Sequence, residues 1–364
     1  MSKSITIKTP GKLMIAGEFA VLEKYQKLVV MAVDRFVYAT LEQSGDNRLS
    51  LHNFDLTDIE WAWTDKHVVI RTDDDRVRFV ENAMTVVYSY LAENNILVEP
   101  FHLKVRSELD DTGGQKYGLG SSAAVVTAVI AAVLKKFLPQ KASQQLIFKL
   151  ASISHVITQG NGSGADVAAS SHGGMLQYSS FQADWLLDAY DKAGTITELA
   201  GSDWPYFSLS PTRLPENLHI CIGWTGSPAS TSSLIQKIRR LKDTNELLYE
   251  QFLSDSGKAV GSFLDGVQHD YATKVIEGVR LNRQALSVVG KNAGVDIETS
   301  ALTVLCDLAE KHGGAGKPSG AGGGDCGIAF MPSEEQANEL MKAWKKAGIK
   351  PLDLTLCSDG AVMI

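Results

Sequence analysis

The first 40 residues show the pattern of hydrophobic and polar positions that is typical of β-strands. Ile5 and Ile7 alternate with polar residues, and a short apolar run follows at 29–33. Alternation indicates a half-buried strand, and a short apolar run bounded by turn residues indicates a buried one. Gly11 and Gly17 are expected to break this segment into turns.

Farther along the chain, strand and helix patterns alternate. Segments 67–71 and 77–80 flank an acidic turn and predict a hairpin, and 102–107 alternates as a strand. An Ala- and Val-rich helix beginning near Ser122 is apolar on almost every side and should be buried in the centre of a domain. The helices expected in this part of the chain are 82–95, 122–137 and 143–159.

Residues 184–216 contain several Trp and Pro residues with little periodicity, and we expect the domain boundary there. The predicted domains are 1–205 and 206–364. The elements expected in the second domain are a strand at 218–224, helices to about 313, a strand at 328–331, a helix at 334–347 and a last strand at 353–357. This order predicts an α+β sandwich.

Length and charge narrow the classes of function. The chain has 364 residues, enough for two domains, and its formal net charge is −7. That charge opposes nucleic acids and anionic membranes as partners, whereas a local cluster of cations can still bind a small anionic substrate. No apolar run is long enough to span a bilayer. The four cysteines are scattered without a CxxC pair, so we expect a protein of the reducing cytoplasm.

A glycine-rich segment, KYGLGSSAA at 116–124, leads directly into the apolar helix. Such a turn presents backbone N–H groups and the positive end of the helix dipole to one point, where a phosphate can bind. Glycine lets the main chain approach the anion closely. The alternative is an ordinary helix cap after a tight turn. The candidate ATP-phosphate-binding residues are Gly118, Leu119, Gly120, Ser121, Ser122 and Ala123.

Two matches to the dinucleotide-binding fingerprint fail on their context. After the match at 118–123, the position that should hold an acidic residue has Gln140 and Lys141. The match at 322–327 leads into a predicted strand instead of a helix. A nicotinamide-dependent dehydrogenase is therefore disfavoured.

Two further glycine-rich segments and one lysine carry candidate chemistry. Asp166 follows the turn GNGSGAD near a helix start, where it caps the helix, binds a metal, accepts a proton or holds a lysine. The segment 317–326, KPSGAGGGDC, is either a loop that closes over a ligand or a plain connection. Lys12 lies in TPGKLMIAGEFAVL, and its alternative is a surface lysine before a strand.

Together these segments resemble the three motifs of the GHMP kinases. Pro10–Leu22, Gly118–Ala124 and Gly320–Asp325 resemble the first, second and third motifs, in the family's order. GWTGSPASTSSL at 223–234 resembles a stretch of the bacterial phosphomevalonate kinase branch. The resemblance implies a two-domain α+β fold, with an N-terminal α/β domain, a C-terminal ferredoxin-like domain and the active site in the cleft between them.

The same resemblance implies transfer of the γ-phosphoryl group of ATP to 5-phosphomevalonate, giving 5-diphosphomevalonate and ADP on the mevalonate route to isoprenoids, with Mg²⁺ as cofactor. Lys12 and Asp166 are the implied catalytic residues. Lys12 would bridge the two phosphates, while Asp166 orients it, acts as a base or binds metal. Ser122 is the implied metal contact. The implied substrate-binding residues are Lys12, Ser163, Ser230, Thr231, Ser232, Gly322 and Gly323.

The sequence departs from the family pattern at one place. In mevalonate kinases a metal-binding Glu lies on the helix before the catalytic Asp, whereas here the comparable position holds His155. His155 and His172 are interpreted as structural histidines. The alternatives are mevalonate kinase or another GHMP kinase, and a non-catalytic sensor of the same fold. The chain is expected to be a monomer or a homodimer that binds no nucleic acid and no membrane.

Overall fold

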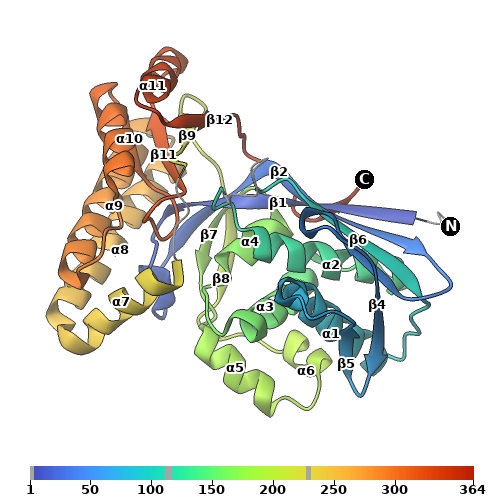
Figure 1. Ribbon diagram of the computed structural model, residues 1–364. Helices are drawn as coiled ribbons and strands as arrows, with labels where there is room; N and C mark the ends of the chain where they lie inside the picture. The colour runs from blue at the N-terminus through green and yellow to red at the C-terminus, as the bar shows by residue number, and fades with distance from the viewer. Residues whose placement is uncertain (1–3, 111–116, 227–230) are drawn as a thin grey trace.

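The computed structural model describes residues 4–110, 117–226 and 231–364, which fold around two β-sheets (Figure 1). The larger sheet is built on two long antiparallel strands, β1 (Ser4–Ala16) and β2 (Leu28–Gln43). Its other strands are β3 (Arg48–Leu51), β4 (Leu56–Thr64), β5 (His67–Ile70), β6 (Phe101–Ser107), β7 (Met175–Ser179), β8 (Ser208–Thr212) and β13 (Val362–Met363). Because β13 pairs with β1, the C-terminus returns to the larger sheet.

Strand β1 passes without a break through Gly11, so the prediction that Gly11 breaks this segment is wrong. The pairing with β2 instead shifts at this point, from Pro10 opposite Phe36 to Gly11 opposite Val33. Such a bulge bends the strand without ending it. A Cβ atom on Gly11 would lie 2.9 Å from the carbonyl oxygen of Leu119, so glycine is needed here for close approach.

Six helices accompany the larger sheet. They are α1 (Arg78–Glu93), α2 (Ser121–Phe137), α3 (Gln144–Gln159), α4 (Ala165–His172), α5 (Ala183–Lys192) and α6 (Ile196–Gly201). Helices α1, α2 and α4 contact its strands, and α3, α5 and α6 pack on these helices or on one another. Helix α2 contacts α1, α3 and α4 as well as β1 and β2, and every residue from Val126 to Leu134 is buried. The expected central position of this apolar helix is confirmed.

The smaller sheet is antiparallel throughout, in the order β10-β11-β9-β12. Its strands are β9 (His219–Trp224), β10 (Ala315–Pro318), β11 (Cys326–Met331) and β12 (Lys350–Leu352). The accompanying helices are α7 (Thr231–Thr244), α8 (Glu246–Gln268), α9 (Ala272–Ala293), α10 (Ser300–Lys311) and α11 (Glu334–Lys346). Helices α8 and α9 form a long pair that also contacts β1 (Figure 1). The predicted α+β class is confirmed.

The predicted hairpin around the acidic turn is wrong. The hairpin consists of β4 and β5, joined by Asp65 and Lys66 in the left-handed region with φ of 46° and 73°. The segment predicted as its second strand, 77–80, instead begins α1. A short apolar run does not distinguish a strand from a buried helix by itself, and here the long helix that follows decides the outcome.

The segment expected to hold the domain boundary contains regular elements, and one further prediction fails, at the C-terminus. Residues 184–216 contain most of α5 as well as α6 and β8, despite their weak periodicity. The last strand expected at 353–357 is also wrong, because Leu356 forms only an isolated bridge to Val33. Strand β8 lies beyond residue 205 yet pairs with β7 in the larger sheet. The chain therefore passes from the larger sheet to the smaller one between β8 and β9. The division at 205 stays a prediction.

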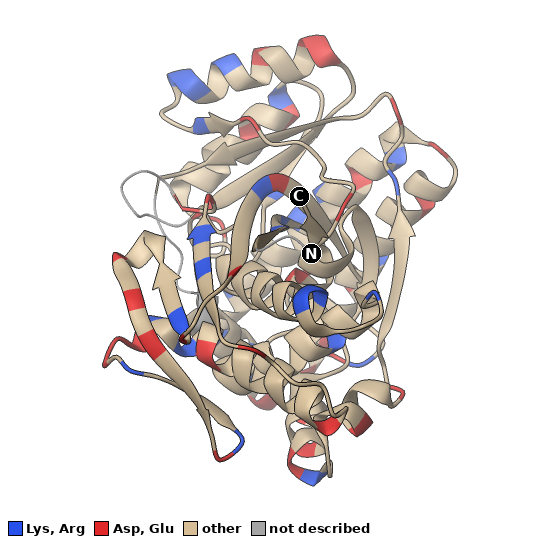
Figure 2. Ribbon diagram, turned by 90° about the vertical axis from the view of Figure 1, so that its right-hand side faces the viewer, with Lys and Arg blue, Asp and Glu red and all other residues tan. Residues whose placement is uncertain are grey.

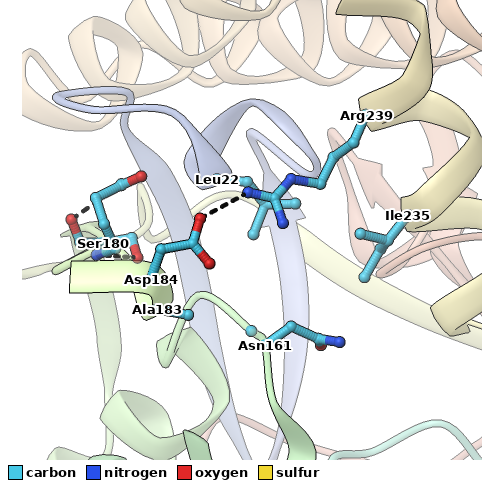
Figure 3. A pocket seen from close by; sticks show the side chains of 9 residues that line it. Leu22, Asn161, Ser180, Ala183, Asp184, Ile235 and Arg239 are labelled. Carbon is cyan, nitrogen blue, oxygen red and sulfur yellow. Dashed lines mark hydrogen bonds and ion pairs between the residues drawn. The ribbon is translucent and has the colours of Figure 1, made fainter. Parts of the chain in front are cut away.

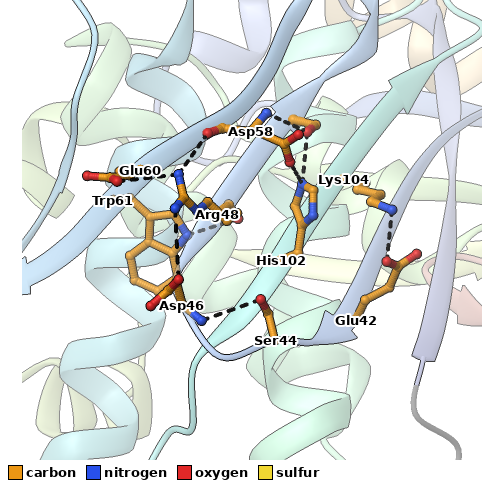
Figure 4. A network of polar contacts seen from close by, with 10 residues as sticks. Glu42, Ser44, Asp46, Arg48, Asp58, Glu60, Trp61, His102 and Lys104 are labelled. Carbon is orange, nitrogen blue, oxygen red and sulfur yellow. Dashed lines mark hydrogen bonds and ion pairs between the residues drawn. The ribbon is translucent and has the colours of Figure 1, made fainter.

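The outer face of the larger sheet is polar. Lys104 on β6 donates to Glu42 on β2 at 2.8 Å, and the hydroxyl of Ser50 on β3 lies 2.8 Å from the ring of His102 on β6 (Figure 4). Arg48 and Glu60 form an ion pair at 3.4 Å. Exposed cross-strand pairs of this kind contribute about 0–1 kcal/mol each and need no ligand to explain them.

Figure 2 shows acidic and basic residues interspersed over the ribbon. Among the described helices, none combines the length and the hydropathy that crossing a bilayer requires.

We predict that Phe148→Ala lowers the free energy of unfolding by about 3–5 kcal/mol. Phe148 is fully buried, stacks on Phe207 at 5.0 Å and meets the ring of Trp204 at 6.1 Å. Urea unfolding measures the effect. Leu97→Ala, at a side chain that is 92% exposed, should change stability by less than about 0.5 kcal/mol. Equal effects of the two substitutions would contradict this packing.

Candidate active site

A cleft of about 650 Å³ opens where both sheets contribute loops. Its walls come from β1, the glycine-rich loop before α2, the end of α3, the start of α4, helix α7 and the loop between β10 and β11. The predicted site residues that line this cleft are Lys12, Gly118, Leu119, Gly120, Ser121, Ser122, Ser163 and Asp166. Ala123 is buried one residue deeper in α2.

The glycine-rich loop delivers the N-terminus of α2 to the cleft. Gly118 and Gly120 both adopt a φ of 79°, which side chains other than glycine rarely tolerate. A Cβ atom on Gly120 would lie 2.9 Å from the Lys12 side chain. Gly120 is the N-cap residue and α2 has no side-chain cap, whereas Ser143 caps α3. The helix therefore turns backbone N–H groups and its positive dipole end toward the cleft.

Lys12 is held close to this loop. Its backbone N–H donates to Leu119 O at 2.8 Å and its ammonium group to Gly118 O at 3.0 Å. The side chain is 8% exposed, and burial lowers the pKa of Lys12 below its usual 10.5, while Asp166 and Asp325 act in the opposite direction. Lys12 is thus a buried cation in the field of two carboxylates.

Asp166 lies in the first turn of α4, and its Oδ1 accepts a hydrogen bond from the N–H of Val167 at 3.0 Å. The loop before Asp166 is held by contacts with two aromatic side chains. The Tyr178 hydroxyl donates to Ser163 O at 2.6 Å, and Gly164, with a φ of 77°, lies against Phe181. Asp166 therefore projects from a rigid support.

Ser122 and His155 meet at the wall formed by α2 and α3. The Ser122 hydroxyl lies 3.1 Å from His155 Nε2, and the imidazole also packs on the Phe79 ring at 5.5 Å. His155 is buried and lines the cleft. The sequence places His155 where mevalonate kinases have a metal-binding Glu and predicts a structural histidine there; in the structure its side chain forms part of the cleft wall. His172 contacts the Ser171 hydroxyl at 2.9 Å.

A buried ion pair joins the two sheets beside the cleft. Lys317, fully buried on β10, donates to Glu18, which follows β1 and is 4% exposed. Asn282 on α9 donates to the other Glu18 oxygen at 3.0 Å and accepts from Gly17 N–H at 3.0 Å. Sequence reasoning gave these three residues no role. The only local signal is a lysine in an otherwise apolar and glycine-rich strand.

The loop between β10 and β11 contributes Ser319, Gly320, Ala321 and Asp325 to the cleft wall. Ser319 Oγ donates to Met14 O and accepts from Met14 N–H, both at 3.0 Å, which anchors the loop on β1. The predicted residues Gly322 and Gly323 pack against Ile297 instead: Gly323 N–H donates to Ile297 O at 2.8 Å.

Three of the predicted substrate-binding residues, Ser230, Thr231 and Ser232, are neighbours in sequence that carry hydroxyl groups. Ser230 lies outside the described residues, and Thr231 and Ser232 begin α7 with side chains that are not described. Ile235, one turn farther along α7, does line the cleft. Within the described ranges, no group of three or more His, Cys, Asp and Glu side chains is arranged to hold a metal ion.

Comparison with known proteins agrees with this arrangement. Residues 79–174 match the family model "GHMP kinases N terminal domain", and residues 276–350 match "GHMP kinases C terminal". A phosphomevalonate kinase from a Streptomyces species is 33% identical, covering 98% of each chain.

Two solved structures share the fold over nearly the whole chain. The structure of a Lin0012 protein from Listeria innocua has a TM-score of 0.93 at 34% identity, covering 99% of each chain. The Streptococcus pneumoniae phosphomevalonate kinase in complex with phosphomevalonate and AMPPNP has a TM-score of 0.84 at 27% identity, covering 96% of this chain and 99% of that one. The chain belongs to the GHMP kinase family, whose members are ATP-dependent kinases.

We predict that Lys317→Met destabilises the protein by about 3–5 kcal/mol, because it leaves the Glu18 carboxylate buried without its cation. Urea unfolding of Lys317→Met, Glu18→Gln and the double variant should give a double-variant loss well below the sum of the single losses. Lys192→Met removes an exposed pair with Asp188 and should cost less than about 1 kcal/mol. A loss as small for Lys317→Met would contradict the buried pair.

Proposed function

We propose that this protein transfers the γ-phosphoryl group of ATP to the phosphate of 5-phosphomevalonate, forming 5-diphosphomevalonate and ADP. The observation that carries the proposal is the buried Lys12 ammonium, held by Gly118 O beside the uncapped start of α2. Two like-charged phosphates can be brought together there. The relatives from Streptomyces and Streptococcus pneumoniae are named phosphomevalonate kinase, and the similarity covers 98% and 99% of their chains.

The start of α2 is suited to the phosphates of ATP. Backbone N–H groups from Gly118 to Ala123, aided by the helix dipole, would hold the phosphate oxygens. A Mg²⁺ ion prefers oxygen ligands, few of them from the protein, and completes its shell with phosphates and water. The Ser122 hydroxyl and the Asp166 carboxylate line the same cleft and fit that requirement. The metal would neutralise phosphate charge.

The acceptor does not need a strong base. A phosphate monoester has its second pKa near 6 and is mostly dianionic at pH 7, so its attacking oxygen is already deprotonated. That oxygen forms a bond to the γ-phosphorus as the bond to the ADP oxygen breaks. The obstacle is repulsion between anions, which Lys12 would offset in the transition state. Asp166, which interacts electrostatically with Lys12, would keep its ammonium group charged and oriented.

Other activities of the fold are the competing proposals. A mevalonate kinase would have to deprotonate an alcohol, which gives Asp166 the role of a base. A non-catalytic sensor has no need of a buried lysine between carboxylates. The structural position of Lys12 therefore favours a kinase, and the similarity to phosphomevalonate kinases favours a phosphate over an alcohol as the acceptor.

We expect turnover of 5-phosphomevalonate and little turnover of mevalonate, homoserine or galactose in an ADP-release assay. The reason is the similarity to phosphomevalonate kinases over nearly the whole chain. Faster turnover of mevalonate would overturn the substrate assignment while leaving the family intact. Absence of any ADP release would favour the sensor.

The pH profile should separate the roles of Lys12 and Asp166. Wild-type kcat/KM should fall below about pH 6, where the acceptor becomes protonated. It should also fall on the alkaline side at a pH below the usual lysine pKa of 10.5, because burial lowers the pKa of Lys12 and the neutral amine cannot offset charge. Lys12→Arg should lose this alkaline fall and recover only part of the activity that Lys12→Ala loses.

Asp166→Asn should be milder than Asp166→Ala if Asp166 orients the lysine, since an amide oxygen still accepts a hydrogen bond. The acid fall near pH 6 should persist in Asp166→Asn. Two equally inactive variants, or loss of the acid fall in Asp166→Asn, would instead assign Asp166 as the base. Steady-state kinetics over pH 5–10 give both readings.

A further inference from the structure

The charged side chains on the cleft wall provide no cation for the carboxylate end of the proposed acceptor among the described residues. The acceptor proposed above carries two anionic ends, a phosphate and a carboxylate. Among the described residues that line the cleft, the carboxylates are Glu18, Asp110, Asp166 and Asp325, and Lys12 is the single Lys or Arg side chain. Since Lys12 is assigned to the phosphates, a second cation would suit the carboxylate end.

A small cavity of about 20 Å³ adjoins the cleft and contains such a cation. Leu22, Asn161, Gly162 and Ile235 line both spaces, and Arg239 lines the small one (Figure 3). The volume is about that of one water molecule, so the cavity itself holds no substrate. Arg239 follows Ile235 by one helical turn, so both side chains project from the same face of α7.

The partner of Arg239 is weakly held. Arg239 Nη2 lies 3.3 Å from Asp184 Oδ2 on α5, and the two side chains are 46% and 79% exposed (Figure 3). An ion pair this exposed contributes about 0–1 kcal/mol, so the guanidinium can exchange Asp184 for another carboxylate at little cost. A second contact, between Lys242 and Glu23 at 2.8 Å, links α7 to the segment after β1 independently of Asp184.

We propose that Arg239 breaks its ion pair with Asp184 and binds the carboxylate of the acceptor instead. This contact would set specificity for acids that carry a phosphate at the other end of the molecule. With the phosphate between Lys12 and the start of α2, the carbon chain extends toward Leu22 and Ile235, and the carboxylate reaches the shared wall. Guanidinium groups suit this role because they bind a carboxylate through two parallel N–H donors. The inference rests on the proposed function.

The experiment compares Arg239→Gln with Arg240→Gln and Asp184→Asn by steady-state kinetics on 5-phosphomevalonate. Arg240 is the neighbouring exposed arginine and lines neither space among the described residues. Arg239→Gln should raise the KM for 5-phosphomevalonate roughly 10- to 100-fold, with small changes in kcat and in the KM for ATP, because the lost contact is equal in ground and transition states. Arg240→Gln should match wild type.

Asp184→Asn distinguishes recognition from mere support of α7. If Arg239 must leave Asp184 to bind the acceptor, removal of that charge should leave the KM unchanged or lower it. If the pair only fixes α7, both variants should raise the KM to the same extent, which would overturn the inference.

The primary amide of 5-phosphomevalonate supplies the matching change in the substrate. Wild type should bind it as poorly as Arg239→Gln binds the acid, and Arg239→Gln should barely distinguish acid from amide. Equal KM values for Arg239→Gln and Arg240→Gln, with wild-type turnover intact, would sink this inference alone. Absence of wild-type turnover on 5-phosphomevalonate would overturn the proposed function and this inference with it.

Discussion

The candidate active-site cleft depends on the close approach of β1 to the glycine-rich loop before α2. Backbone and side-chain nitrogens of Lys12 both donate to that loop, at 2.8 Å and 3.0 Å. This distance is possible because Gly11 and Gly120 carry no Cβ atom where the two segments meet. The same contact brings the lysine ammonium group to the start of α2, so the cation and the helix dipole act on one point.

The second constraint is the buried ion pair between Glu18 and Lys317. It connects the turn after β1 to the smaller sheet, and Asn282 completes the hydrogen bonding of the carboxylate. A buried pair of this kind contributes little over an apolar replacement, yet breaking one half is costly. Its effect here is positional, because Glu18 also accepts a hydrogen bond from Gly320 N–H at 3.4 Å and so holds the loop after β10 beside the end of β1.

The cleft wall carries more carboxylates than cations among its described residues. An acidic wall opposes the binding of two polyanions unless its carboxylates are themselves paired with cations. Glu18 is neutralised by Lys317, and Asp166 and Asp325 stabilise the charged form of Lys12, which burial alone would disfavour. The acidic groups therefore support the cation, while backbone dipoles and a bound metal ion would supply the remaining positive potential.

The sequence alone determined the features that are local. Gly118 and Gly120 indicate a turn with positive φ before a helix, because glycine adopts that conformation most readily. The burial of α2 follows from its apolar residues. The order of the three motifs gave the family and hence the two-domain fold. Short apolar runs such as 77–80 were assigned wrongly, because a local pattern of that length fits both a strand and a helix.

The tertiary structure decided which distant residues meet. Glu18 and Lys317 are 299 residues apart in sequence, Ser122 and His155 are 33 apart, and Asp184 and Arg239 are 55 apart. Each of these residues is unremarkable in its own segment, since a charged or polar side chain fits a solvated surface equally well. Packing between elements brings them together: β10 and α9 beside the end of β1, α2 against α3, and α7 beside α5. These contacts arise between elements, so they leave no local periodic signal.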